Sequence, residues 1–193
     1  VNALDGDFVR AAEKLCREHD MLLMIDEVQT GNGRTGKLYA YEHFGVRPDV
    51  VTTAKGLGGG LPIGACMMGE KCADTLTAGT HGSTFGGNPV SCAGAVSILS
   101  RIDDELLCEV AKKGAYLKER LEGADGVSSV TGLGLMLGVK TRGDASDVLA
   151  LMRKNGVLAL KAKDKVRLLP PLNITWEHLE KAAEVMRKAC AAL

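Results

Sequence analysis

Two short apolar segments are each followed closely by a charged side chain, and this arrangement restricts the fold more than any other feature of the sequence. The run Met21–Ile25 (MLLMI) is continuously apolar, which predicts a strand covered on both faces, and Asp26 follows it. Residues 49–53 (DVVTT) predict a second buried strand, and Lys55 stands just beyond its end. Because ligands of α/β sheets bind at the carboxyl ends of strands, we expect Asp26 and Lys55 to belong to one site.

Lys55 is the candidate reactive group of that site. A partly buried ammonium loses hydration, so burial favours the neutral amine, which is the form that attacks a carbonyl to give a Schiff base. The glycines behind it, Gly56 and 58–60, allow a tight turn and a close approach of the backbone to a ligand. We therefore predict that Lys55 holds a cofactor covalently. The alternative is a surface lysine in a glycine-rich hinge, which is the commoner role of such a segment taken alone.

The amino-terminal part reads as an α/β domain. An amphipathic helix is predicted over residues 5–19, ahead of the first strand. A third strand is predicted at 64–68, and Asn88 caps a helix that runs to residue 102. Helices that alternate with strands are typical of a mostly parallel sheet.

The composition changes after residue 103, which predicts a domain boundary there. Beyond it, helices alternate with short strands interrupted by glycine, the pattern of an α+β unit. We therefore predict an α/β domain over 1–103 and a small α+β domain over 104–193. The expected elements of the second domain are helices at 105–121, 144–155 and from Thr175 onward, and strands at 127–140, 157–160 and 166–169.

Residues 31–37 (GNGRTGK) fit two nucleotide-binding patterns, and both fits are poor. In a phosphate-binding loop Leu38 would be a serine or threonine, and the loop would precede the acidic strand instead of following it. In a dinucleotide-binding turn the glycines would come directly off the strand and begin a helix, but DEVQT intervenes. The simpler interpretation is a glycine-rich turn that carries Gln29 and Arg34 over the strand ends.

The bulk composition excludes several classes of function. The 24 basic and 24 acidic residues give no net charge, so nucleic acid is not an expected partner. No apolar run approaches the ~20 residues that span a membrane, and no signal peptide is visible, so we expect a cytoplasmic protein. The six cysteines are scattered without a CxxC pair, and the four histidines lie far apart, so we predict neither disulfides nor a metal site.

Three motifs in order along the chain resemble the class III aminotransferases, a family that uses pyridoxal 5′-phosphate (PLP). They are IDEVQTGNGRTGKLYAYEHFGVRPDVVTTAKGLGGGLPIGA (25–65), HGSTFGGNPVSCAGA (81–95) and VRLLPPLNIT (166–175). The resemblance covers essentially the whole chain and is closest to members that act on N-acetylornithine. It implies part of a fold-type I PLP-dependent transferase, with an incomplete large-domain sheet over 1–103 and the small carboxy-terminal domain over 104–193.

The resemblance also implies roles for matching positions. Lys55 would bind PLP covalently and then act as general base, Asp26 would pair with the pyridine nitrogen, and Gln29 would lie near the phenolic oxygen. Thr84, with Ser83 beside it, would reach the cofactor phosphate of a neighbouring subunit, because the family forms homodimers. Arg167 would hold a substrate carboxylate; from the residues alone, a surface arginine at a strand edge is favoured.

The implied reaction transfers an amino group from N-acetylornithine to 2-oxoglutarate, giving glutamate, in arginine biosynthesis. Ornithine, succinylornithine, 4-aminobutyrate or a semialdehyde aminomutase substrate remain alternatives, as does a nucleotide-binding protein. Family members are roughly double this length, and the missing half would supply the phosphate loop and a ring-stacking aromatic. We therefore expect this chain alone to be inactive, or to be a non-catalytic fragment with an unpaired sheet edge.

Overall fold

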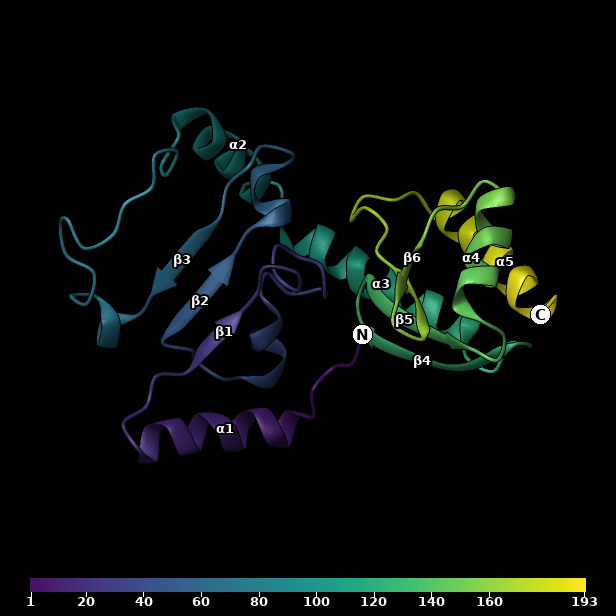
Figure 1. Cartoon of the computed structure of the whole chain (residues 1–193), viewed down its shortest axis with the longest axis horizontal. Helices are drawn as coiled ribbons and strands as arrows, with labels where there is room; N and C mark the ends of the chain where they lie inside the picture. The colour runs from purple at the N-terminus through teal and green to yellow at the C-terminus, as the bar shows by residue number, and fades with distance from the viewer. The chain divides into compact units, whose positions relative to one another are not determined.

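The computed structural model describes residues 1–193, which form two compact units. One unit comprises residues 4–104, and the other comprises 105–193 together with Val1–Ala3. The elements of the first are α1 (Gly6–Glu18), β1 (Met24–Asp26), η1 (Ala40–Phe44), β2 (Val50–Thr53), η2 (Lys55–Gly58), β3 (Ala65–Met68), η3 (Glu70–Cys72) and α2 (Pro89–Leu99), where η marks a 3₁₀-helix (Figure 1). The elements of the second are α3 (Asp104–Leu121), β4 (Val127–Leu133), β5 (Met136–Thr141), α4 (Ala145–Lys154), β6 (Leu160–Ala162), β7 (Lys165–Leu168) and α5 (Trp176–Ala191).

The sheet of the first unit has the strand order β1-β2-β3. The β1 and β2 strands are parallel, with Ile25 opposite Val51, whereas β2 and β3 are antiparallel. The central strand β2 is mostly buried, as predicted. The prediction that the first strand is covered on both faces was wrong, because Met24 in β1 is 63% exposed. As an edge strand, β1 has a neighbour on one side only, so its side chains lack the packing partners that β2 has.

The first helix, α1, is capped by Asp5, one of two aspartates that could fill this position. The Asp5 carboxylate accepts hydrogen bonds from the backbone N–H groups of Asp7 and Phe8, which are unpaired donors of the first turn. The expected apolar face is nevertheless largely exposed, since Phe8 and Leu15 lie in solvent and only Val9 is buried. The sequence pattern thus predicted the helix correctly but not its buried face, because the short η1 that it contacts covers only part of that face.

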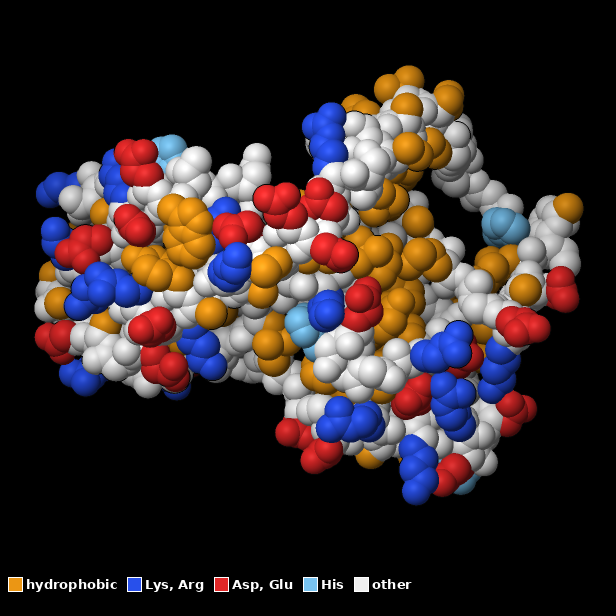
Figure 2. Space-filling view, turned by 180° about the vertical axis from the view of Figure 1, so that it is seen from behind, with side chains coloured by type: hydrophobic (Ala, Val, Ile, Leu, Met, Phe, Trp, Pro, Cys, Tyr) orange, Lys and Arg blue, Asp and Glu red, His pale blue; other side chains and the backbone are white.

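Apolar side chains remain exposed over much of the first unit, and Figure 2 shows several of them gathered on its surface. Those that are more than half exposed are Leu4, Phe8, Leu15, Met24, Phe85, Val90 and Val96. An exposed apolar surface of this kind marks an interaction face in a folded protein. No helix of the structure is long and apolar enough to cross a bilayer.

The second unit packs helices on an antiparallel sheet of strand order β4-β5-β7-β6. Residues 127–140, which were predicted to contain a strand with glycine breaks, form the β4–β5 hairpin, in which Leu133 pairs with Met136 across a turn. The segment Val1–Ala3 joins this unit through the carbonyl of Val1, which accepts from the Thr131 hydroxyl. The helices α3, α4 and α5 cover one face of the sheet and enclose its core, which includes Val110, Leu117, Leu121, Val130, Leu137, Val139, Val148, Met152, Val166, Leu179 and Met186.

We expect Leu121→Ala to lower the free energy of unfolding of this second unit by about 2–5 kcal/mol. Leu121 is fully buried at the end of α3, so truncation removes apolar contacts and leaves a cavity. Urea unfolding followed by the fluorescence of Trp176, the one tryptophan of the chain, reports on this unit. The matched control is Leu158→Ala, at a side chain that is 82% exposed. Equal losses in the two variants would contradict the assignment of Leu121 to the core.

Candidate active site

Asp26 and Lys55 lie at the same end of the sheet, where the parallel strands β1 and β2 have their carboxyl ends. Asp26 is the last residue of β1 and is paired in register with Thr52 of the parallel strand β2. Its Oδ1 accepts a hydrogen bond from the Thr52 hydroxyl at 3.0 Å and another from the backbone N–H of Val28 at 2.9 Å. Lys55 begins η2 two residues after β2 ends. Because β1 and β2 are parallel, their carboxyl ends lie side by side, which brings Asp26 and Lys55 to the same end of the sheet.

The environment of Asp26 favours its ionised form. The backbone N–H of Val28 and the Thr52 hydroxyl, with a smaller contribution from the charge of Lys55, lower the pKa of the Asp26 carboxyl below its ordinary value. Hydrogen bonds donated to a carboxylate stabilise its charge, so Asp26 remains an anion at neutral pH and somewhat into the acid range. A fixed anion at the carboxyl end of β1 suits a ligand that presents a protonated ring nitrogen.

Lys55 differs from expectation in its surroundings. The sequence predicted a partly buried lysine, whereas the side chain is exposed. Its backbone adopts φ = 48°, in the left-handed region that non-glycine residues rarely occupy. The amine therefore extends from a backbone conformation that must be held by its neighbours.

The helix α2 packs closely on the segment that begins with Lys55. A Cβ added to Gly94 of α2 would lie 2.8 Å from the Leu61 side chain and 3.1 Å from the Gly58 carbonyl oxygen. The approach therefore requires a residue without a side chain at position 94. Ile98 of α2 reaches Gly59 in the same way, so α2 fixes one side of the η2 turn.

The glycine-rich turn after β1 folds back on its own residues. Asn32 and Gly33 both have positive φ, as at the centre of a type I′ turn, and the N–H of Arg34 donates to the Gly31 carbonyl. A Cβ on Gly31 would lie 2.8 Å from the Glu27 carbonyl oxygen, so glycine is required there. The turn leads to η1 and not to an α-helix, so neither nucleotide-binding pattern of residues 31–37 has the helix N-terminus that it needs.

Two buried polar residues of this turn were missed in the sequence. Glu27 is 1% exposed, and its carboxylate accepts from the backbone N–H of Tyr41 at 2.9 Å and from the Thr30 hydroxyl. Asn32 is 7% exposed and donates to residues beside Lys55. The Asn-Gly dipeptide indicated the turn, but nothing in the sequence indicated what the asparagine contacts.

The remaining candidates of the first unit lie in the turn after β1 or in the loop ahead of α2. Gln29 is half-buried in the turn that follows Asp26. Ser83 and Thr84 are exposed in the loop that precedes the α2 cap, and no hydrogen bond joins them to Lys55 or Asp26. The structure therefore brings Asp26 and Lys55 together, with Gln29 three residues after Asp26 in the turn.

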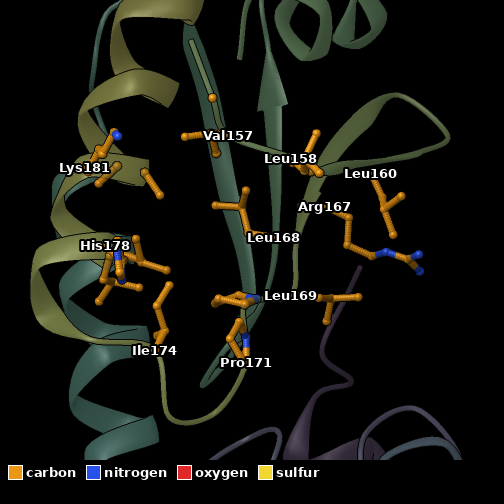
Figure 3. Close-up of a pocket in the computed structure, with 17 residues that line it drawn as sticks. Val157, Leu158, Leu160, Arg167, Leu168, Leu169, Pro171, Ile174, His178 and Lys181 are labelled. Carbon is orange, nitrogen blue, oxygen red and sulfur yellow. The ribbon is translucent and has the colours of Figure 1, made fainter. Parts of the chain in front are cut away.

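Arg167 belongs to the second unit, on β7. It pairs in register with Gly138 of β5 and Leu160 of β6, makes no ion pair, and has a buried Nε without a hydrogen-bond partner. It lies at the border of a largely apolar cavity of about 580 Å³ between α5 and the strands. Figure 3 shows its guanidinium pointing away from His178 and Leu168 (Figure 3). An arginine without an acidic partner is available to an external anion.

Comparison with known proteins places the chain in a family. The model of the class III aminotransferases matches residues 1–190. The chain belongs to this family, whose cofactor is PLP.

Named relatives narrow the similarity. The chain is 48% identical to the acetylornithine aminotransferase of Haemophilus ducreyi over 195 aligned positions, covering all of this chain and 50% of that protein. It is 45% identical to the Aquifex aeolicus protein of the same name, covering 97% of this chain and 50% of that protein. The chain thus spans about half the length of the curated relatives it matches.

Solved structures agree in fold. The ornithine aminotransferase of Toxoplasma gondii matches with a TM-score of 0.93 and 36% identity, over 100% of this chain and 48% of that one. The acetylornithine aminotransferase of Elizabethkingia anophelis matches with a TM-score of 0.90 and 34% identity, over 98% and 52%. A further structure of the Toxoplasma enzyme, crystallised with oxidised glutathione, shows partial occupancy of PLP at its active site.

The residues at the carboxyl ends of β1 and β2 fit PLP. The cofactor presents an aldehyde, which a lysine amine binds covalently, and a pyridine nitrogen, which an ionised carboxylate keeps protonated. Lys55, just after β2, offers an amine, and Asp26, at the end of the parallel strand β1, offers a carboxylate.

Proposed function

We propose that this chain carries the lysine-bearing half of a PLP-dependent aminotransferase that acts on N-acetylornithine and 2-oxoglutarate in arginine biosynthesis. The observation that carries the proposal is the placement of Asp26 and Lys55 at the carboxyl ends of two parallel strands, where the pKa of the Asp26 carboxyl is lowered. The names of the most similar curated relatives support the choice of amine.

In this proposal the residues of the chain divide the work. PLP, when bound, supplies an electron sink for the carbanion that forms at the substrate carbon. The Asp26 carboxylate holds the ring nitrogen protonated, which its lowered pKa permits at neutral pH. The Lys55 amine would hold the cofactor covalently and would also serve as the general base for the proton of the substrate carbon.

Four further residues have proposed roles. The half-buried Gln29 would contact the phenolic oxygen of the cofactor, and Arg167 would bind a substrate carboxylate through its planar guanidinium. Ser83 and Thr84 bind the cofactor phosphate of a second subunit. Their exposure in the loop ahead of α2 leaves both hydroxyls free for such a contact.

We further propose that the complete enzyme is a homodimer through α2. This helix consists mostly of apolar and small residues and carries no charged side chain, and Val90 and Val96 on it are exposed, as is Phe85 just before it. A helix of that composition is normally buried, and a second copy that covers it would lie beside Ser83 and Thr84. Sedimentation of the complete enzyme should give a dimer, and Val96→Asp should shift it toward monomer. A monomer before mutation would contradict this interface.

The substrate assignment is tested with a panel of amine donors given to a complete enzyme that contains this sequence. We expect N-acetylornithine to give the highest kcat/KM, with 2-oxoglutarate as acceptor. Ornithine is the second candidate, because structures of ornithine aminotransferases are among the similar ones. A preference for ornithine, succinylornithine or 4-aminobutyrate would overturn the substrate but not the reaction class, whereas no transfer from any donor would overturn both.

Covalent capture of PLP tests whether the 193-residue chain forms the site by itself. The chain is mixed with PLP, reduced with borohydride, digested and mapped by mass. A single adduct on Lys55 supports the proposed role of this lysine. Adducts scattered over the surface lysines, with aggregation on gel filtration, would instead support a fragment without a formed site.

A further inference from the structure

Asn32 ties the turn after β1 to the peptide that precedes Lys55. Its Nδ2 donates to the Thr53 hydroxyl oxygen at 3.0 Å and to the Ala54 carbonyl oxygen at 3.1 Å. Asn32 and Thr53 are both buried. The tie joins segments that are more than twenty positions apart in the chain, so it holds the tertiary arrangement of the strand ends.

The orientation of the Asn32 amide follows from these contacts. A flipped amide would set Oδ1 against the carbonyl oxygen of Ala54, which is also an acceptor, so Nδ2 must face Ala54. The other end of the amide, Oδ1, is buried without a hydrogen-bond partner. A buried acceptor without a donor destabilises a fold. The Asn32 Nδ2 therefore keeps its hydrogen bond to the Ala54 carbonyl although the Oδ1 of the same amide is in an unfavourable environment.

The contact is made where the backbone is strained. Lys55 follows Ala54 and has φ = 48°. A lysine in that conformation is less stable than in the ordinary regions, and it persists only where the surroundings fix it. Asn32 fixes the Ala54 carbonyl on one side of Lys55 through its amide. On the other side, a Cβ added to Gly56 would lie 3.8 Å from the Asn32 Cβ, so the asparagine lies close to the residues before and after the lysine and is hydrogen-bonded to the one before it.

We propose that Asn32 is a positioning residue for Lys55: its amide holds the Ala54 peptide so that the lysine keeps its left-handed backbone and directs its amine toward the cofactor aldehyde. This inference rests on the proposed function, in which Lys55 is the covalent attachment point. It assigns the glycine-rich turn a part in the lysine site. Without the amide contact, the Lys55 segment relaxes toward ordinary backbone conformations and samples the reactive geometry less often.

The test measures the rate at which PLP is captured at Lys55, not turnover. A complete enzyme that contains this sequence is freed of cofactor, mixed with PLP, reduced with borohydride at timed intervals, and mapped by mass. Asn32→Gly removes the amide but tolerates positive φ. Asn32→Asp keeps the shape and replaces the donor with a carboxylate oxygen.

The matched control is Thr35→Val in the same turn. The Thr35 hydroxyl is buried and lies 3.1 Å from His43 Nε2, so its loss loosens the turn while leaving the Asn32 contact to Ala54 in place. Tm is measured for all variants, because a purely structural effect would follow Tm and not the identity of the residue.

We expect both Asn32 variants to slow capture at Lys55 by about tenfold, the effect of losing a constraint worth one or two hydrogen bonds. Thr35→Val should capture within about twofold of the parent even where its Tm is lower. Parental rates in the Asn32 variants, or equal slowing in the control, would overturn the inference alone. If Asn32→Gly does not fold, Asn32→Asp decides the question. A parent whose adducts lie elsewhere than Lys55 would overturn the proposed function and this inference with it.

Discussion

Replacing Lys55 with alanine is expected to lower the turnover of a complete enzyme containing this sequence by at least about 10³-fold. In the proposed mechanism the substitution removes both the amine that would hold the cofactor and the base that would later move the proton, so two contributions would be lost at one position. The fold should tolerate the change, because the Lys55 side chain is exposed. The substitution should not relieve the backbone strain at position 55, because alanine disfavours positive φ as lysine does.

Two measurements separate the loss of chemistry from a loss of structure. Turnover is measured with saturating donor and acceptor, and borohydride trapping then tests for a covalent adduct, which Lys55→Ala should lack while still binding PLP noncovalently. The control is Lys14→Ala on α1, where the lysine side chain is 74% exposed and pairs only with Glu18 at 3.7 Å. Near-parental turnover in Lys55→Ala, or an adduct that remains, would assign the attachment to another lysine.

Asp26→Asn is expected to lower turnover by about 10²- to 10⁴-fold while leaving the adduct on Lys55 in place. The amide oxygen of asparagine can still accept from the Val28 N–H and the Thr52 hydroxyl, so the local structure is retained and only the charge is lost. In the proposed mechanism Asp26 would keep the pyridine nitrogen of PLP protonated, and the neutral asparagine would weaken the electron-withdrawing power that the cofactor supplies. The defect should therefore appear in the proton-transfer step and not in cofactor attachment.

The dependence on charge has a specific check. A PLP analogue methylated on the ring nitrogen carries a permanent positive charge, so it should restore part of the activity of Asp26→Asn and add little to the parent. Asp7→Asn on α1 is the control, because it removes an exposed carboxylate that pairs with Arg10. The lowered pKa also predicts that the parent keeps the ionised form below the ordinary range of aspartate and loses it only as the pH falls through the lowered value. A parental rate in Asp26→Asn would mean that Asp26 has another role.

Local signals in the sequence predicted most elements of the fold. The caps at Asp5, Asn88, Asp144 and Thr175 each accept hydrogen bonds from a first helical turn. Such signals are readable because a cap and its helix are adjacent in the chain. Strand pairing was less predictable: the direction of β3 and the β4–β5 hairpin depend on which distant segments meet. Burial was the least predictable property, as the exposed faces of α1 and β1 demonstrate.

The sequence by itself determined the chemical groups of the candidate site and their positions relative to each strand. Asp26 and Lys55 were identifiable because each follows its own apolar segment, and a strand end is a local property. Only the tertiary structure decided how those groups are held. The parallel register that sets Thr52 against Asp26, and the contact of Asn32 with Ala54, join residues more than twenty positions apart. No local pattern encodes such contacts, because they form only when the strands have paired and the turn has closed over them.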